Sequence, residues 1–248
     1  MEKSDLLESV TGCLAGVAIG DAMGLPTQFM TPEGIKAEFG QIEGFEAPPD
    51  WHPYGDSTPG TVTDDTEQTL ALAVALIAEG GDLTPAGTAE ALLGWAREHD
   101  LLGTDEIGPS TGKALKAIEG GKNPKETGFS GTTNGASMRI SPIGLIHPLV
   151  HEKEKEKLWR AVRRACTPTH NTPIAIGGAT TVATAIAEGV SGTENIDRII
   201  KSAKESGVTA FRESEEELPR VSEINEEKKM NLLLGRVSPS LSRRIEMG

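Results

Sequence analysis

The sequence is poor in three features, and each shortage excludes a class of protein. Only two cysteines occur among 248 residues; Cys13 and Cys166 stand far apart and outside any metal-ligand spacing, so neither a disulfide scaffold nor a thiolate zinc site is expected. Aromatic residues make up 4%, too few for a platform that stacks single-stranded nucleic acid. The sequence has no run of about 18 apolar residues and no signal peptide, and we therefore expect a cytoplasmic protein without a membrane span.

Basic side chains are scarce in the first part of the chain. Residues 1–150 contain 8 basic and 22 acidic side chains, whereas residues 151–248 contain 16 and 15. With a formal net charge of −13, the protein should repel phosphate backbones, so no nucleic-acid partner is expected. A small phosphate-containing molecule can still bind an acidic surface when divalent cations lie between them.

Helical spacing of the apolar residues dominates the sequence. Leu6, Val10 and Leu14 recur every four positions, a period typical of an amphipathic helix. Three later helices are expected at about 151–166, 172–190 and 195–206. The acidic stretch 213–218 should be a solvated turn. Because no alternating strand pattern of useful length occurs, the predicted fold class is all-α.

The first motif that could carry chemistry is Thr63-Asp64-Asp65-Thr66, which follows a long Pro- and Gly-rich loop over residues 41–62. Two carboxylates and two hydroxyls at a helix start offer the hard oxygen ligands that Mg²⁺ and Mn²⁺ prefer. Acidic residues also cap helices and interact favourably with the helix dipole. The motif alone therefore indicates either a divalent-cation site or an ordinary helix start.

The second motif, Gly131-Thr132-Thr133-Asn134-Gly135, is rich in glycine and hydroxyl groups. Backbone N–H groups and hydroxyls of this kind can hold a diphosphate at the start of a helix. The alternative is a solvent-exposed turn in which Asn134 and Gly135 supply positive φ angles. Both interpretations stay open on the sequence alone.

Two further motifs stand next to predicted helices. In Thr169-His170-Asn171-Thr172-Pro173, His170 is a candidate for holding a ribose hydroxyl or for acid–base work. The alternative is a surface histidine beside a helix cap. Gly20-Asp21-Ala22-Met23-Gly24 follows an apolar helix, and there we expect Asp21 in a tight turn with its carboxylate bonded to backbone amides.

In this order and spacing, the four motifs resemble the ADP-ribosylglycohydrolase family of all-α enzymes. The matching residues are Gly16–Gly24, Thr63–Glu67, Thr133–Arg139 and Thr169-His170, and the resemblance extends from near the N-terminus to about residue 190. It implies a compact bundle of helices that forms a single domain over residues 1–248.

The resemblance implies a site that holds two Mg²⁺ or Mn²⁺ ions. Thr63, Asp64 and Asp65 would be metal ligands, and the two aspartates would take part in catalysis. A bound cation can orient ribose hydroxyls, help to activate water and offset the charge that forms in an oxocarbenium-like state.

The resemblance also implies how the ligand would bind. Asn134 and the backbone of Gly131, Thr132 and Thr133 would lie near the ribose and the diphosphate, and His170 would contact the adenosine side. The reaction would be hydrolysis of the glycosidic bond that joins ADP-ribose to a modified protein side chain or to a small conjugate.

Two features depart from the family pattern. Gln28, which we expect among the substrate-binding residues, stands where many members carry an acidic residue that is a candidate for activating water. An amide cannot act as a general base. The family also has a later Asp-x-Asp-Thr segment that completes both metal shells, and no such segment occurs in these 248 residues. The domain is therefore expected to be incomplete at its C-terminus, with weakened cation binding.

Three functions follow as hypotheses. The first is the metal-dependent hydrolase of ADP-ribosylated substrates. The second is a catalytically silent module that binds ADP-ribose or a related nucleotide, which the departures at Gln28 and at the metal ligands favour. The third is a purely structural helical protein whose loops only cap helices.

Overall fold

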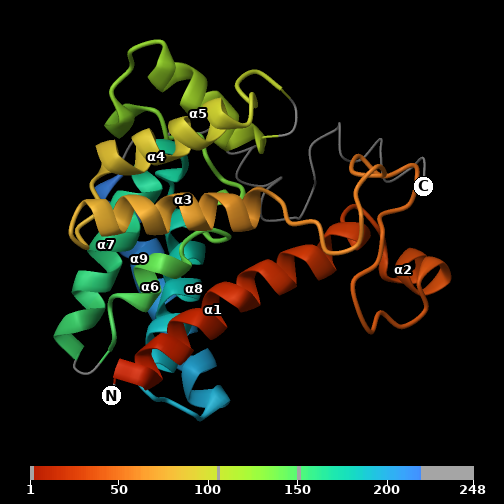
Figure 1. Ribbon diagram of the computed structural model, residues 1–248. Helices are drawn as coiled ribbons and strands as arrows, with labels where there is room; N and C mark the ends of the chain where they lie inside the picture. Colours follow the sequence, from red (N-terminus) through yellow and green to blue (C-terminus); the bar gives the residue numbers. More distant parts are fainter. Residues whose placement is uncertain (1–2, 105–106, 150–151, 219–248) are drawn as a thin grey trace. The chain divides into compact units, whose positions relative to one another are not determined.

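The computed structural model describes residues 3–104, 107–149 and 152–218, which form helices and connecting segments without a strand (Figure 1). The α-helices are α1 (Lys3–Gly24), α2 (Pro32–Glu38), α3 (Asp64–Ala78), α4 (Pro85–Glu98), α5 (Pro109–Glu119), α6 (Ser141–Leu145), α7 (Glu152–His170), α8 (Pro173–Val190) and α9 (Ile196–Glu217). Short 3₁₀ helices are η1 (Leu25–Thr27), η2 (Pro124–Glu126) and η3 (Asn134–Ala136). The all-α prediction is confirmed.

The chain divides into two compact units. Among the described residues, unit 1 consists of 3–15, 64–104, 107–149 and 152–218, and unit 2 consists of 16–63. Unit 1 contains α3 to α9, whereas the described part of unit 2 contains the end of α1, η1, α2 and the loop before α3. The single domain expected from the sequence stays a prediction.

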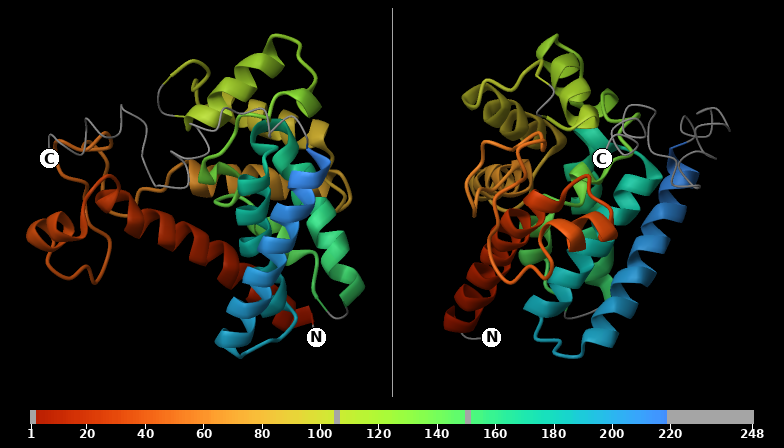
Figure 2. Two further views of the ribbon diagram at one scale, coloured as in Figure 1. Left: turned by 180° about the vertical axis from the view of Figure 1, so that it is seen from behind. Right: turned by 90° about the vertical axis from the view of Figure 1, so that its right-hand side faces the viewer.

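Helix α8 lies at the centre of unit 1, and α9 runs beside it along most of its length (Figure 2). Ala179, Ala183 and Ala187 of α8 are all fully buried. Their small side chains let neighbouring backbones come close. A Cβ added to Gly144 of α6 would lie 2.7 Å from the Ala183 carbonyl oxygen, so this approach requires glycine.

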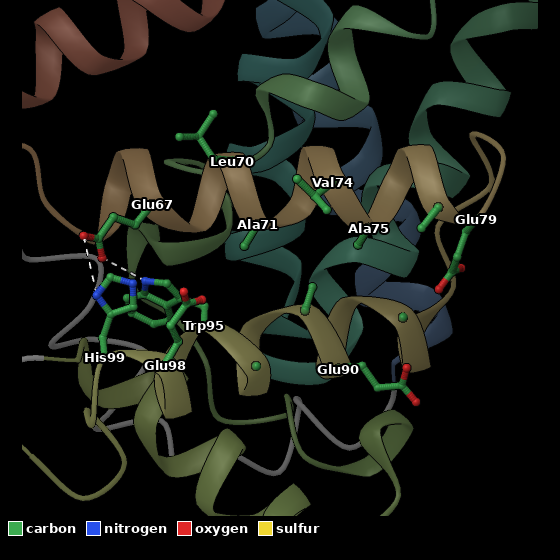
Figure 3. A pocket seen from close by; sticks show the side chains of 14 residues that line it. Glu67, Leu70, Ala71, Val74, Ala75, Glu79, Glu90, Trp95, Glu98 and His99 are labelled. Atoms are coloured by element: carbon green, nitrogen blue, oxygen red, sulfur yellow. Dashed lines mark hydrogen bonds and ion pairs between the residues drawn. The ribbon is translucent and has the colours of Figure 1, made fainter.

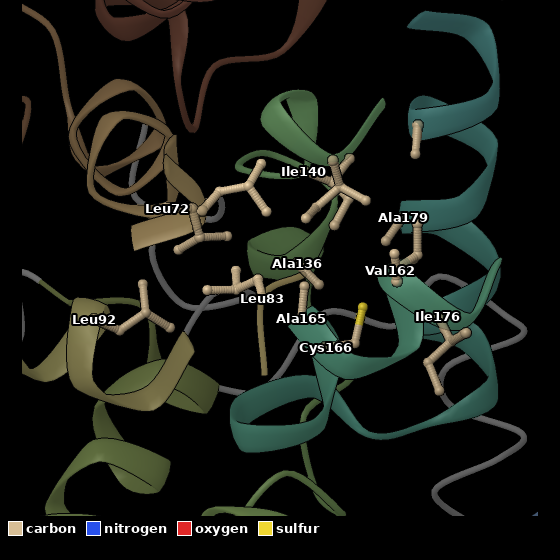
Figure 4. Packing of buried hydrophobic residues seen from close by; sticks show 14 of the residues in the cluster. Leu72, Leu83, Leu92, Ala136, Ile140, Val162, Ala165, Cys166, Ile176 and Ala179 are labelled. Atoms are coloured by element: carbon tan, nitrogen blue, oxygen red, sulfur yellow. The ribbon is translucent and has the colours of Figure 1, made fainter. Parts of the chain in front are cut away.

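The apolar core of unit 1 joins residues from several helices (Figure 4). Leu72 of α3 and Leu92 of α4 pack in the same cluster as Val162 and Cys166 of α7 and Ile176 of α8, and all five side chains are fully buried. Removal of this apolar area from water stabilises the unit.

Threonine–proline steps start three of the helices. The hydroxyls of Thr31, Thr84 and Thr172 each accept a hydrogen bond from the backbone N–H three residues later. Proline follows directly in each case, at a position where its missing N–H costs nothing. The cap at Thr172 confirms the predicted start of α8.

Helix α9 is longer than the sequence analysis expects. The predicted end near residue 206 and the solvated turn at 213–218 are wrong, because the helix continues to Glu217. Ala210, Ser214 and Leu218 are buried, and their four-residue spacing prolongs the stripe that packs inside unit 1. The charged residues between them lie on the exposed face, and they make the buried stripe difficult to recognise from the sequence.

Two helical segments of the described chain are long and apolar enough to cross a membrane by length and composition alone. They are Asp5–Thr27 around α1, of which 6% is buried, and Pro173–Val190 of α8, of which 61% is buried. Core helices of soluble proteins and N-terminal signal sequences pass the same test, so the finding carries little weight. The absence of a membrane span stays a prediction.

Candidate active site

A buried hydrogen-bonded chain begins at Asp64, the first residue of α3. The side-chain amide of Gln68, one turn later, donates from Nε2 to Asp64 Oδ2 at 3.1 Å. Gln68 Oε1 accepts from Nη1 of Arg139 at 2.6 Å. Gln68 is fully buried and Arg139 is 1% exposed, so these bonds replace the water that both polar groups lose on folding.

Arg139 joins this chain to the end of α7. Its Nη2 donates to Thr169 Oγ1 at 2.6 Å. Burial lowers the pKa of Arg139 to about 10, against the smaller opposing effects of Cys166 and Asp64. The guanidinium therefore remains charged at neutral pH and needs the acceptors that Gln68 and Thr169 supply.

His170 continues the chain toward the Gly/Thr-rich loop. Its Nδ1 lies 2.8 Å from Thr169 Oγ1, and its Nε2 lies 2.9 Å from Thr133 Oγ1. The ring is fully buried. Burial and then the charge of Arg139 lower the pKa of His170 to about 3, so the ring is neutral at physiological pH. A ligand can reach either ring nitrogen only by replacing a protein partner.

The loop over residues 128–135 presses against the corner between α7 and α8. A Cβ added to Gly131 would lie 1.9 Å from the Thr169 carbonyl oxygen, and one added to Gly135 would lie 2.8 Å from Cε1 of His170. The Thr172 hydroxyl donates to the Gly131 carbonyl at 2.6 Å. The loop backbone therefore follows the helix corner so closely that no side chain fits at these two glycines.

The exposed part of the loop is short. Thr133 and Asn134 are exposed, Thr132 is half-buried, and Gly131 and Gly135 are buried. Asn134–Ala136 forms η3, and neither Asn134 nor Gly135 has a positive φ angle. The alternative of a turn with positive φ is therefore wrong: Gly135 is needed because the His170 ring approaches it.

In unit 2, Asp21 holds the residue that precedes α3. The Asp21 carboxylate accepts from the backbone N–H and from the hydroxyl of Thr63, both at 2.7 Å. The expected bond to a backbone amide is confirmed, but the expected tight turn is wrong, because α1 continues through Asp21 to Gly24. The amide partner lies 42 residues further along the chain.

Gln28 of unit 2 is held through its backbone. The backbone N–H of Tyr54 donates to Nδ1 of His52 at 3.1 Å, so Nε2 of that ring carries the hydrogen and donates to the Gln28 carbonyl at 3.2 Å. Burial lowers the pKa of His52, against a smaller opposing effect of the Gln28 carbonyl. The Gln28 residue itself is exposed.

Comparison with known proteins matches the chain to a protein family. The model for ADP-ribosylglycohydrolase matches residues 2–244. The chain belongs to the ADP-ribosylglycohydrolase family. The sequence resemblance to this family is thereby confirmed, and the family suggests hydrolase activity.

Three relatives show the reach of the similarity. The chain is 33% identical over 214 residues to the uncharacterized protein YegU of Escherichia coli, which covers 84% of this chain and 63% of that protein. An uncharacterized Archaeoglobus fulgidus protein is 35% identical over 180 residues, with 73% and 55% covered. ADP-ribosyl-[dinitrogen reductase] glycohydrolase of Rhodospirillum rubrum is 32% identical over 166 residues, with 66% and 51% covered. The chain thus spans less than two thirds of the length of these three relatives.

The oxygen donors of this glycohydrolase homologue fit part of a divalent-cation shell. Thr63, Asp64 and Asp65 follow one another in sequence and supply a hydroxyl and two carboxylates, the ligand type that Mg²⁺ takes. Thr63 can donate its proton to Asp21 and still coordinate through its oxygen. Within residues 3–104, 107–149 and 152–218, no group of three or more His, Cys, Asp or Glu side chains is placed to hold a metal.

A separate apolar groove of about 650 Å³ lies between α3 and α4 (Figure 3). Leu70, Ala71 and Val74 of α3 line it. At one end the Glu67 carboxylate accepts from Trp95 Nε1 at 2.8 Å. Among the residues of the predicted motifs, only Glu67 lines this groove. The acidic side chains at the start of α3 therefore lie in two different environments: Glu67 lies at the groove, and Asp64 lies at the hydrogen-bonded chain.

Sequence reasoning missed Gln68 and gave no role to Arg139. Gln68 stands one helical turn after Asp64, which places both side chains on one face of α3. Arg139 stands in the otherwise uncharged segment Ala136–Leu145, where a charged side chain needs buried partners. A single charged residue in an uncharged segment therefore indicates a buried, hydrogen-bonded side chain, but it does not identify the residues that bond to it.

Proposed function

We propose that this protein is a Mg²⁺- or Mn²⁺-dependent hydrolase that cleaves the glycosidic bond between ADP-ribose and a modified protein side chain or small conjugate. The observation that carries the proposal is the hydrogen-bonded chain from Asp64 to Thr133, because it joins one candidate cation ligand, Asp64, to the candidate ligand loop within unit 1. Membership of the ADP-ribosylglycohydrolase family supports a glycohydrolase activity in general.

The residues of this chain would act as follows. Asp64 and Asp65 would hold the cations together with Thr63, and the cations would supply charge stabilisation and orient the ribose hydroxyls. Thr133 and Asn134, exposed at the loop, would donate hydrogen bonds to ribose or diphosphate oxygens. His170 is neutral at physiological pH, so we assign it hydrogen bonding rather than proton transfer.

The proposed partners and location follow the same argument. We propose an ADP-ribosylated protein or small ADP-ribose conjugate as the substrate, in line with the name of the Rhodospirillum rubrum relative. The acidic excess of residues 1–150 argues against nucleic acid as a partner. We also propose a cytoplasmic location, with which the two free cysteines are compatible.

A second candidate function is a silent module that binds ADP-ribose. Two observations favour it. Gln28 presents an exposed amide where many family members carry an acid, and the part of the chain that the structure describes offers no cluster of three acidic, histidine or cysteine ligands for a metal. Binding without turnover is the expected behaviour of such a protein.

The experiment that separates the two functions measures ADP-ribose release from ADP-ribosylated arginine and serine peptides, with Mg²⁺, with Mn²⁺ and with a chelator. Release that requires a cation supports the hydrolase. If no condition gives release but calorimetry detects ADP-ribose binding, the silent module is correct. If neither release nor binding is found, both proposals are wrong.

A further inference from the structure

The buried chain described above has Arg139 at its middle, and a guanidinium differs from every other member of the chain. It has five N–H donors and no acceptor. A donor-only group fixes the direction of each hydrogen bond that it makes, and it can fix the direction of the next bond as well. Both arms of Arg139 can be followed in this way.

The first arm leads to Asp64. Because Arg139 Nη1 can only donate, the oxygen of the Gln68 amide must face it, at 2.6 Å. The amide nitrogen then faces Asp64 Oδ2, at 3.1 Å. The opposite orientation of the amide would place two donors against each other in a buried site, which is costly. Asp64 is therefore held as an acceptor of a side-chain N–H.

The second arm leads to Thr133. Arg139 Nη2 donates to Thr169 Oγ1 at 2.6 Å, which leaves the single hydroxyl proton of Thr169 to point elsewhere. His170 Nδ1 lies 2.8 Å from that hydroxyl. The second lone pair of Thr169 would also let the hydroxyl accept from an Nδ1–H, whereas in the arrangement proposed below Nδ1 accepts the proton. The neutral ring then carries its own hydrogen on Nε2, and this hydrogen points to Thr133 Oγ1 at 2.9 Å.

We propose that Arg139 is a positioning residue that sets every hydrogen bond of this chain to run outward, toward Asp64 at one end and toward Thr133 at the other. Thr133 accepts from His170, so its hydroxyl proton is left to donate outward from an exposed position. A hydroxyl donor of this kind suits a phosphate or ribose oxygen. Only the identity of the ligand at Thr133 rests on the proposed function; the direction of the bonds does not.

The direct test is the tautomer of His170, observed as ring-nitrogen signals in NMR spectra of the full ¹⁵N-labelled chain. The signals of His170 are assigned by their loss in His170→Gln. We expect them to stay unchanged from pH 5 to pH 8, because the pKa is lowered to about 3, and to show hydrogen on Nε2. Hydrogen on Nδ1 in the wild-type protein would overturn the proposal.

Variants of Thr169 test whether the direction is transmitted. Thr169→Val keeps the shape and removes the hydroxyl, so we expect the Nε2–H form to give way to a mixture of both tautomers. Thr169→Ser retains a hydroxyl and should restore the wild-type signals. If Thr169→Val leaves the tautomer unchanged, Arg139 does not act through Thr169 and the proposal is wrong. Because hydrogen on Nδ1 in the wild-type spectrum would by itself overturn the proposal, the proposal can still be tested if the variant does not fold.

The same variants connect the chain to the ligand. Thr169 is 1% exposed, yet Thr169→Val should weaken ADP-ribose binding in calorimetry by roughly tenfold, the effect of about one hydrogen bond. Thr169→Ser should rescue the affinity. Leu92→Ala, a core change in α4 that also lowers stability, is the matched control and should leave the affinity unchanged.

The outcomes separate this inference from the proposed function. Nε2–H on His170 in the wild type and mixed tautomers in Thr169→Val, but no ADP-ribose binding, would contradict the proposed function and leave the positioning role of Arg139 supported. A wild-type protein that binds ADP-ribose and has Nδ1–H on His170 would support ligand binding and contradict the positioning role of Arg139.

Discussion

The two ends of the hydrogen-bonded chain are built by different means. At the loop end, Gly131 and Gly135 contact the α7–α8 corner so closely that a Cβ would lie 1.9 Å and 2.8 Å from its nearest neighbours. At the acidic end, Asp64 and Asp65 are half-buried at the start of α3. Packing shapes the first end, whereas side-chain hydrogen bonding from Gln68 helps to orient the second.

This difference predicts which end of the chain is sensitive to mutation in folding stability and which end is sensitive in ligand binding. Changes at the loop end should cost folding stability, because tightly packed backbone cannot accept new atoms. Changes at the acidic end should leave the fold intact and affect cation-dependent ligand binding. The predictions below run from the largest expected effect on stability to the smallest.

Gly131→Ala should have the largest effect on stability. The new Cβ would lie 1.9 Å from a backbone oxygen of α7, which cannot move without distorting the helix end. We expect the free energy of unfolding to fall by roughly 3 kcal/mol in urea denaturation. Gly94→Ala in α4, where nothing lies within 4 Å, is the matched control and should be neutral or stabilising. Equal stability of the two variants would remove the argument that packing shapes the loop end.

Acid should destabilise the loop end through His170. In the unfolded chain this histidine takes up a proton below a pKa near 6.5, whereas in the folded protein it does so only near 3. The unfolded state thus binds more protons between these values, and stability falls as the pH drops from 6.5 toward 3. The expected loss is about 2 kcal/mol at pH 5. Denaturation of wild type and His170→Gln at several pH values isolates it, and identical pH slopes would show that His170 is not buried in its neutral form.

Asp64→Asn should change stability little and binding greatly. The amide can still accept from Gln68, so we expect a change in unfolding free energy below about 0.5 kcal/mol. Mn²⁺-dependent binding of ADP-ribose should disappear in calorimetry, because a charged oxygen ligand is lost. Glu90→Gln on α4 removes the same charge away from the site and should behave as wild type. Unchanged cation affinity in Asp64→Asn would leave Asp64 as a helix-start residue only.

Gln28→Glu should have the smallest effect on stability, because Gln28 is exposed. If this position supplies the general base, the variant should release ADP-ribose from the modified peptides roughly 100-fold faster than wild type. Gln41→Glu adds the same charge at another exposed position of unit 2 and should give no gain. Equal rates in both variants would place the general base elsewhere.

The helices were predictable because their signals are local. Apolar residues at three- and four-residue spacing and the Thr–Pro steps at Thr31, Thr84 and Thr172 act within one or two turns. The extension of α9 was not predicted because this local signal is absent there. The buried stripe of α9 continues through Ser214, but small and polar buried residues within an acidic run show no apolar periodicity.

The site was only partly predictable. Its motifs could be found in the sequence, but Gln68 and Arg139 are 71 residues apart, and no local pattern indicates which buried partner an arginine will find. The role of Gly135 was misjudged likewise, because the histidine that requires it comes from another part of the chain. Metal binding at Asp64 and Asp65 and ligand contact by Asn134 stay predictions.

The most direct test of the central claim is calorimetric titration of the wild-type protein with ADP-ribose, in Mn²⁺ and again in chelator. The account predicts binding in Mn²⁺ and loss of that binding in chelator, because the acidic end needs a cation before it can face a diphosphate ligand. Equal affinity in both solutions, or no binding in either, would contradict a site that joins Asp64 to the Gly131–Asn134 loop.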